Sequence, residues 1–239
     1  MSQRHPIIAI TGSSGAGTTS VMQTFKHIFR REEINAALVE GDAFHRFDRA
    51  EMRVQMAEAA RRGDNHFSHF GPESNLFAEL ETLFRTYGET GNGLTRQYRH
   101  DDGTFTPWIE LPPRTDLLFY EGLHGGVATD GVDVARHVDL LIGVVPIINL
   151  EWIQKIHRDK AQRGYSTEAV VDTILRRMPD YVNHICPQFS RTHVNFQRVP
   201  TVDTSNPFIS HQKGSGGGLT RHSEPMGRGS AENPSRGIL

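Results

Sequence analysis

The sequence has little of three features that would each define a class of protein. Its single cysteine, Cys186, excludes a disulfide within the chain and is typical of a reducing cytoplasm. No apolar run reaches the roughly 20 residues of a membrane-spanning helix, and no signal peptide precedes the first predicted strand. The 26 Lys and Arg nearly balance the 28 Asp and Glu, which excludes a generally basic nucleic-acid wrapper. We therefore expect a cytoplasmic globular protein that binds neither membranes nor nucleic acid.

What the sequence does contain is a regular alternation of strand and helix patterns. Short apolar runs predict strands within residues 6–12, 36–40, 117–120, 138–148 and 198–203. Apolar residues at helical spacing predict helices over residues 18–31, 48–62, 72–87, 150–163 and 167–178, with Gly88 ending the third. A hairpin that turns at Asp102-Gly103 is predicted over residues 95–108. The alternation predicts an α/β fold with a mostly parallel sheet flanked by helices.

Composition divides the chain at residue 210. Residues 1–209 contain all the predicted strands and helices, and we expect them to form one domain. Residues 210–239 hold 7 Gly and 5 Ser without apolar periodicity. They cannot bury enough apolar surface to offset the entropy lost on ordering, so a disordered tail is expected there.

A glycine-rich segment joins the first predicted strand to the first predicted helix. It has the G-x-x-x-x-G frame of a phosphate-binding loop and reads Gly12-Ser13-Ser14-Gly15-Ala16-Gly17-Thr18-Thr19. Backbone N–H groups and the helix dipole would hold the phosphates of ATP there. Thr19 is the hydroxyl expected at Mg²⁺, but Thr18 stands where such loops usually carry lysine, so a cation from elsewhere is required. A purely structural glycine turn is the alternative reading of this motif by itself.

Charged residues follow two of the predicted strands. Asp42 lies after the second strand, at the edge where open α/β sheets bind ligands, and could accept a proton from a hydroxyl. His45 and Arg49 in the same segment could hold an anion. Glu121 ends an apolar strand, the arrangement of a Walker B acid that acts on Mg²⁺. The plain alternatives are a turn cap for Asp42 and an ordinary surface acid for Glu121.

One predicted helix carries several charges on a single face. Lys155, Arg158, Asp159 and Arg163 are spaced i, i+3, i+4 and i+8. Three cations around one carboxylate suit a polyphosphate with a metal, and they would supply the cation that the glycine-rich loop lacks. A solvated face of ion pairs is the alternative for this segment alone.

Four segments occur in an order that resembles a known family. They are Gly-Ser-Ser-Gly-Ala-Gly-Thr, Glu-Gly-Asp-Ala-Phe-His-Arg-Phe, Phe-Tyr-Glu-Gly-Leu-His-Gly and Asn-Leu-Glu-Trp-Ile-Gln-Lys-Ile-His-Arg-Asp. From about Ile7 to Ile209 the chain is similar to the bacterial-type phosphoribulokinases. The resemblance implies a P-loop kinase fold like that of adenylate kinase, with a mixed sheet, and a homo-oligomer. It also implies ATP- and Mg²⁺-dependent phosphorylation of ribulose 5-phosphate at O1, which gives ribulose 1,5-bisphosphate in the Calvin cycle. After Ile209 the Gly/Ser-rich tail replaces the further strands and helices that the family carries.

The resemblance also implies roles for individual residues. Asp42 matches the catalytic base, Asp159 a second essential carboxylate at the metal, and Glu121 the Walker B acid. Lys155 and Arg158 match the cations at the transferring phosphoryl group. The positions that the family assigns to the sugar phosphate are His45, Arg49, Tyr98, His100 and Arg163.

Two other functions stay open at this point. A nucleoside kinase like uridine kinase uses a related loop and a carboxylate base. His45 and Arg49, which could both bind an anion, and the segment that begins at Glu121 favour a phosphorylated sugar over a nucleoside. A catalytically inactive nucleotide-binding subunit is the second alternative, because the C-terminal part departs from the family. Turnover of a substrate panel with ATP distinguishes all three.

Overall fold

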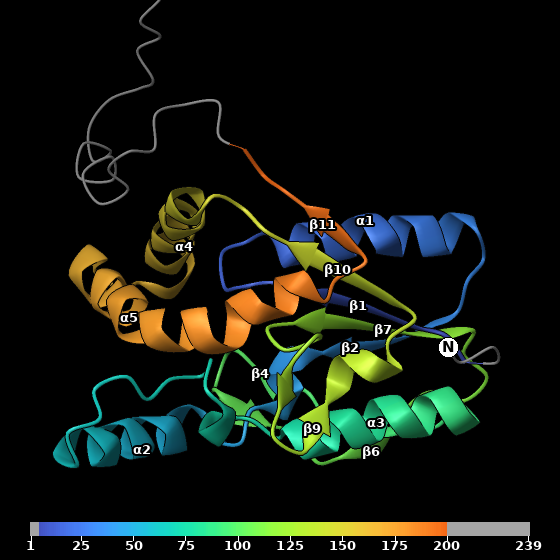
Figure 1. Cartoon of the computed structure of the whole chain (residues 1–239), viewed down its shortest axis with the longest axis horizontal. Helices are drawn as coiled ribbons and strands as arrows, with labels where there is room; N and C mark the ends of the chain where they lie inside the picture. Colours follow the sequence, from blue (N-terminus) through green and yellow to red (C-terminus); the bar gives the residue numbers. More distant parts are fainter. Residues whose placement is uncertain (1–4, 200–239) are drawn as a thin grey trace, which may run out of the picture.

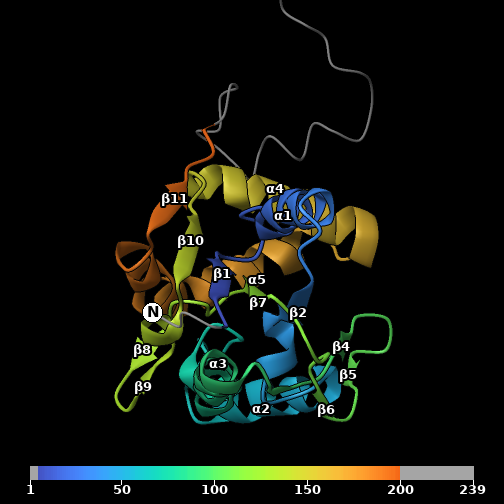
Figure 2. The same ribbon diagram turned by 90° about the vertical axis from the view of Figure 1, so that its right-hand side faces the viewer.

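The computed structural model describes residues 5–199. The predicted tail over residues 210–239 and the end of the strand predicted at 198–203 lie outside this range. Within it, the chain runs through a central sheet with helices around it (Figures 1 and 2).

Five strands form the central sheet. They are β1 (Ile7–Thr11), β2 (Ala36–Glu40), β7 (Leu117–Gly122), β10 (Leu140–Val144) and β11 (Val194–Phe196). Their order is β11-β10-β1-β7-β2, and each neighbouring pair is parallel. This confirms the α/β class and the mostly parallel sheet. Within residues 5–199 the central sheet contains parallel strands only. The antiparallel strand of the mixed sheet that the resemblance implies is not seen in this range.

Helices supply the crossovers that parallel strands require. They are α1 (Thr18–Arg31), α2 (Arg49–Arg61), α3 (Phe77–Thr90), α4 (Ile148–Arg163) and α5 (Thr167–Asp180). In Figure 1, α1 lies above the strands and α3 below them, while α4 and α5 lie at the end to which the strand arrows point. The turned view shows α1 and α4 at the top and α3 and α2 at the bottom (Figure 2).

Shorter elements connect these strands and helices. The hairpin predicted over residues 95–108 is confirmed, because β3 (Leu94–Thr95) pairs with β6 (Ile109–Glu110), and β4 (Tyr98–Arg99) pairs with β5 (Thr104–Phe105). A second small hairpin joins β8 (Ala128–Thr129) to β9 (Val132–Asp133). The short helical turns are η1 (Gly41–Phe44), η2 (Pro72–Ser74), η3 (Val134–His137), η4 (Tyr181–Ile185) and η5 (Cys186–Ser190).

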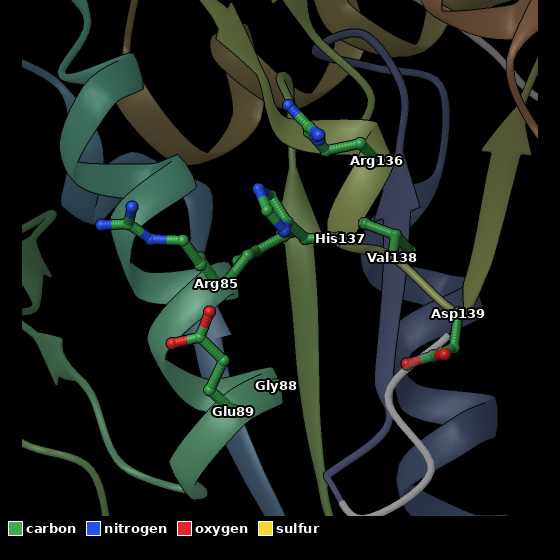
Figure 3. Close-up of a pocket in the computed structure, with 8 residues that line it drawn as sticks. Arg85, Gly88, Glu89, Arg136, His137, Val138 and Asp139 are labelled. Carbon is green, nitrogen blue, oxygen red and sulfur yellow. The ribbon is translucent and has the colours of Figure 1, made fainter.

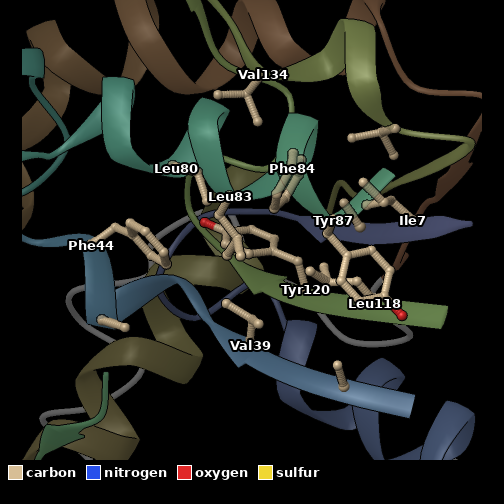
Figure 4. Packing of buried hydrophobic residues seen from close by; sticks show 14 of the residues in the cluster. Ile7, Val39, Phe44, Leu80, Leu83, Phe84, Tyr87, Leu118, Tyr120 and Val134 are labelled. Carbon is tan, nitrogen blue, oxygen red and sulfur yellow. The ribbon is translucent and has the colours of Figure 1, made fainter. Parts of the chain in front are cut away.

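Alternate side chains of the strands enter two apolar layers, one on each face of the sheet. On the α3 side, Ile7 and Tyr120 are fully buried, and the Tyr120 ring packs edge-on against Phe84 at 5.4 Å (Figure 4). On the α1 side, Phe119 packs edge-on against Phe29 at 5.0 Å. Because successive residues of a strand point to opposite faces, the continuous apolar run of β7 serves both layers.

Two of the predicted boundaries are wrong. The helix expected over residues 72–87 is split into η2 and α3, and α3 continues to Thr90 instead of ending at Gly88. It ends at Gly91, whose φ of +75° is the left-handed conformation that glycine adopts without strain. The last strand that the structure describes is β11 at 194–196, where Val194 pairs with Ile142 and Phe196 with Val144 of β10. Residues 198 and 199 are not in a strand, and the rest of the strand predicted at 198–203 lies outside the described residues.

Candidate active site

The predicted site residues meet at one edge of the sheet. All five strands are parallel, so their carboxyl ends lie together, and this is the edge where open α/β sheets bind ligands. The glycine-rich loop follows β1, Asp42 follows β2, and Glu121 lies near the end of β7. Helix α4, which carries Lys155, follows β10 after a short connection.

The loop over residues 12–17 has the backbone that anion binding requires. Gly15 has a φ of +109°, and a Cβ there would lie 2.8 Å from the carbonyl oxygen of Glu151 in α4. Glycine is therefore needed both for the turn and for the close approach of α4. The helix that follows begins at Thr18, so its N-terminus points its dipole into the loop.

Thr18 and Thr19 differ in position. Thr18 is buried, and its hydroxyl forms a hydrogen bond with the Glu121 carboxylate, whereas Thr19 is exposed. Burial raises the pKa of Glu121, and the nearby charges of Asp42 and Glu40 act in the same direction. The residue that replaces the usual lysine is thus a structural partner of Glu121 in this structure.

Asp42 is an ionised carboxylate that follows β2. Its Oδ1 lies 3.2 Å from His45 Nε2, and its Oδ2 lies 3.8 Å from His100 Nε2. Burial alone would raise the pKa of Asp42, but the hydrogen bond and charge of His45, with His100 and His69, hold it well below its usual range. The side chain is still 37% exposed, so a substrate hydroxyl can reach it.

A second cluster gathers around Asp159. Lys155 Nζ lies 2.6 Å from Oδ2, while Arg158 Nε and Arg163 NH1 lie 3.0 Å and 3.3 Å from Oδ1. These cations hold the pKa of Asp159 below its usual range even though burial opposes ionisation. Burial and the Arg177 guanidinium lower the pKa of Lys155 to about 8. Arg158 also donates from NH2 to Ser14 Oγ at 2.9 Å, which joins this cluster to the glycine-rich loop.

The residues expected at the sugar phosphate do not all lie in one place. His45 and His100 flank Asp42, and the Tyr98 ring packs edge-on against His100 at 5.0 Å. Arg49 donates to the carbonyl oxygens of His100 and Asp101 in the hairpin, at 2.5 Å and 3.5 Å. Arg163 instead belongs to the Asp159 cluster.

The residues expected at Mg²⁺ are Thr19, Glu121 and Asp159. Within residues 5–199 no group of three or more His, Cys, Asp and Glu side chains is arranged to hold a metal by itself. Mg²⁺ usually binds through one or two carboxylates together with substrate phosphates. Glu121 fits such a role, because its raised pKa and the nearby charge of Asp42 leave a carboxylate that a cation would stabilise.

Comparison with known proteins identifies the family. A family model described as the phosphoribulokinase/uridine kinase family matches residues 7–205. The chain belongs to this family. A chromosomal phosphoribulokinase of Cupriavidus necator is 70% identical over 89% of this chain and 76% of its own length, and a phosphoribulokinase of Rhizobium meliloti is 64% identical over 88% and 75%.

Solved structures agree with this family assignment. A phosphoribulokinase from Rhodobacter spheroides is 58% identical, with a TM-score of 0.79, over 86% of this chain and 74% of that one. A possible uridine kinase from Bacillus stearothermophilus has a TM-score of 0.54 at 14% identity, over 80% of this chain and 88% of that one. The second likeness shows the shared fold alone, so the nucleoside-kinase alternative is not favoured.

The sequence analysis did not predict three residues of the candidate active site. Glu151 is 4% exposed and accepts a hydrogen bond from Ser13 Oγ at 2.5 Å. Asn75 is 2% exposed and bonds to His45. Arg177 has its pKa lowered to about 10 by burial and lies within the field of both Asp159 and Asp42. Glu151 precedes Lys155 by one helical turn, so its place on the same helix face could have been predicted. Asn75 lies in a loop, where no spacing pattern indicates its contact with His45.

Glu151 leads to a prediction about stability. Burial raises the pKa of Glu151 to about 7, against the opposing effects of Ser13 and Lys155. The folded chain therefore holds a proton there between about pH 4.5 and 7 that the unfolded chain releases, and this contribution to stability is lost as the pH rises. Relative to the unchanged protein, Glu151→Gln should gain about 3 kcal/mol of unfolding free energy between pH 4.5 and 8. Urea unfolding at both pH values measures this, and a constant difference between the two proteins would contradict it.

A separate cavity opens at the opposite edge of the sheet. It has a volume of about 270 Å³ and lies between α3 and the segment that enters β10. Figure 3 shows Arg85 and Glu89 of α3 on one side of it, with Arg136 and His137 of η3 on the other. Asp139, which also lines the cavity, accepts a hydrogen bond from the backbone of Ile7 at 2.9 Å, at the amino end of β1. The cavity is therefore remote from the phosphate loop.

No helix within residues 5–199 is long and apolar enough to cross a membrane.

Proposed function

We propose that this chain is a phosphoribulokinase, which transfers the γ-phosphoryl group of ATP to O1 of ribulose 5-phosphate. The product is ribulose 1,5-bisphosphate, the sugar that accepts carbon dioxide in the Calvin cycle. The observation that carries the proposal is the ionised, reachable carboxylate of Asp42 at the ligand edge of the sheet. Its two imidazole neighbours keep it ionised and able to accept a proton, beside groups suited to an anionic substrate.

ATP is bound by the glycine-rich loop. Its phosphates lie against residues Gly12, Ser13, Ser14, Gly15, Ala16, Gly17, Thr18 and Thr19. The Gly12 and Ala16 N–H groups donate to the carbonyl oxygens of Gly122 and Ser13, so the other backbone N–H groups of this loop hold the phosphates, helped by the dipole of α1. Thr19, Glu121 and Asp159 would hold Mg²⁺, which neutralises the phosphate charge when it is bound. Asp159 is paired with Lys155, Arg158 and Arg163 in this structure. It would supply a carboxylate to the metal, and these cations would then be available to the phosphates.

Asp42 acts on the sugar. It accepts the proton of the O1 hydroxyl while O1 forms its bond to the γ-phosphorus. The bond from the γ-phosphorus to the bridging oxygen breaks in the same displacement, and ADP leaves with that oxygen. Because His45 and His100 keep Asp42 ionised, the acceptor is ready before the substrate arrives.

Lys155 and Arg158 stabilise the charge that develops on the transferring phosphoryl group. They extend from α4 to the loop, and Arg158 already bonds to Ser14. Holding them on Asp159 orients them before ATP binds, and such preorganised charge is a large part of catalysis. They replace the lysine that Thr18 displaces.

The sugar phosphate is held by residues near Asp42. His45 and His100 flank the carboxylate, Tyr98 packs against His100, and Arg49 donates to carbonyl oxygens of the hairpin that carries His100. Arg163 pairs with Asp159 in this structure, so a contact with the same phosphate rests on the family resemblance alone. Arg49 exchanges hairpin carbonyls for phosphate oxygens, so we expect the hairpin to move when the substrate binds.

A substrate panel with ATP tests the function. Purified chain is incubated with ribulose 5-phosphate, with uridine, or without an acceptor, and ADP formation is measured. We expect ADP to form with ribulose 5-phosphate, and not with uridine or without an acceptor. Turnover with uridine would favour a nucleoside kinase, and ATP binding without turnover would favour an inactive nucleotide-binding subunit.

Two further expectations belong to this proposal. The chain works in the cytoplasm, where ATP and sugar phosphates are available, and it forms a homo-oligomer. Light scattering of the purified chain measures the oligomer, and a monomer at working concentration would contradict it.

A further inference from the structure

Asn75 has an amide whose orientation is fixed by its surroundings. Its Nδ2 donates to the carbonyl oxygens of His69 at 2.9 Å and Gly71 at 2.7 Å. Carbonyl oxygens only accept hydrogen bonds, so both Nδ2 hydrogens are used and the amide cannot turn over. The remaining atom, Oδ1, therefore faces His45 Nδ1 at 2.9 Å.

The same contact fixes one proton of His45. Oδ1 of an amide accepts and never donates, so His45 Nδ1 must carry a hydrogen. The backbone holds both residues in place, because Leu76 N donates to Phe44 O and Arg46 N donates to Ser74 O, each at 2.8 Å. Both side chains are less than 10% exposed, so water does not compete for this bond.

The second ring nitrogen of His45 faces the Asp42 carboxylate at 3.2 Å. A neutral His45 with its hydrogen on Nδ1 would present a lone pair to that carboxylate, which is repulsive. We propose that Asn75 is a positioning residue that holds His45 as an imidazolium, with a hydrogen on each ring nitrogen, whenever Asp42 is ionised. Asp42 and His45 then share one proton, which resides on His45.

The other titratable groups around His45 are consistent with this arrangement. The ring of His69 lies 4.5 Å from that of His45, and burial together with the His45 charge lowers the pKa of His69 well below its usual value. Burial also lowers the pKa of His124 to about 3. His100 and Arg177 complete the charged surroundings of this pair. With His69 and His124 neutral, His45 is the buried imidazole that compensates Asp42.

The inference deepens the proposed function and rests on it. An imidazolium beside Asp42 keeps the base ionised, and the same charge attracts the anionic sugar phosphate. Asn75 thus acts through His45 on both proton transfer and substrate affinity without touching the substrate.

Nitrogen NMR of the free protein tests the proton positions without any turnover. The chain is labelled with ¹⁵N-histidine, and the His45 signals are assigned by their loss in His45→Gln. Hydrogens are expected on both ring nitrogens of His45, the one on Nδ1 bonded to Asn75 and the one on Nε2 bonded to Asp42. An unprotonated Nδ1 at pH 7 would overturn the proposal, whether or not the chain phosphorylates ribulose 5-phosphate.

Two substitutions of Asn75 isolate the acceptor. Asn75→Leu and Asn75→Asp both lose the bonds to the loop carbonyls, but only the aspartate keeps an acceptor at His45 Nδ1. In Asn75→Leu, neutral His45 should switch to the Nε2–H tautomer, and the KM for ribulose 5-phosphate should rise about tenfold more between pH 6.5 and 8.5 than in the unchanged protein. Asn75→Asp should keep the Nδ1–H tautomer of His45. Its KM for ribulose 5-phosphate should change between pH 6.5 and 8.5 no more than that of the unchanged protein. Equal behaviour of the two variants would contradict the proposal. If neither folds, the NMR of the unchanged protein decides.

Discussion

Replacing Asp42 with asparagine is expected to lower kcat by about 10²–10⁴-fold. Asparagine keeps the shape of the side chain but removes the proton acceptor, and the loss corresponds to about 3–5 kcal/mol of barrier. ATP affinity should barely change, because the glycine-rich loop and Lys155 bind the nucleotide. Steady-state kinetics with ribulose 5-phosphate and calorimetric titration of ATP measure the two effects separately.

Asp48→Asn is the matched control for this variant. Asp48 accepts from Glu51 N at 2.8 Å as the N-cap of α2, and asparagine caps helices equally well. This control should keep the activity of the unchanged protein. Near-normal turnover in Asp42→Asn would remove the base assignment, and an equal loss of ATP binding and turnover would indicate a metal or structural role.

Replacing Lys155 with methionine is expected to lower kcat by about 10²–10³-fold, the cost of removing one preorganised charge from a transition state. The side chain is buried and lies 2.6 Å from Asp159, so methionine fills the space without the charge. The KM for ribulose 5-phosphate should change much less than kcat, because Lys155 acts on the nucleotide side. Single-turnover measurements with saturating ATP separate the chemical step from product release.

Lys160→Met controls for the loss of a lysine from the same helix. Lys160 is exposed on α4 and takes no part in the Asp159 cluster. Its replacement should leave kcat unchanged. If both lysine variants behaved alike, the charge of Lys155 would have no special role in transfer.

Most of the fold could be predicted from local pattern. The strand at Ala36–Glu40 and the helix at Thr18–Arg31 occur where the sequence predicts them, because an apolar run or stripe there is bounded by clear end signals. The third helix was mispredicted because Gly88 is a weaker end signal than tertiary packing, which carries α3 on to Gly91. The strand at Val194–Phe196 was not predicted, because a three-residue edge strand has too little periodicity to locate.

The candidate site could be predicted only in part. Asp42 and Glu121 follow apolar strands, so the topology of a parallel sheet brings them to one edge. The partners that set their protonation come from distant loops, as Asn75 does for His45, and no spacing rule connects them. Arg163 shares a helix face with Asp159, so the geometry explains its ion pair more directly than a contact with the sugar.

The most direct test of the account is the identity of the product. The purified chain is incubated with ATP, Mg²⁺ and ribulose 5-phosphate, and the reaction is followed by phosphorus NMR. The ester signal of C5 is present from the start, and a second ester signal, at C1 of the same sugar, should grow to equal intensity as ADP forms. In Asp42→Asn this second signal should grow about 10²–10⁴-fold more slowly under the same conditions. Release of inorganic phosphate in place of a C1 ester, or a phosphorylated product with uridine but none with ribulose 5-phosphate, would contradict the account.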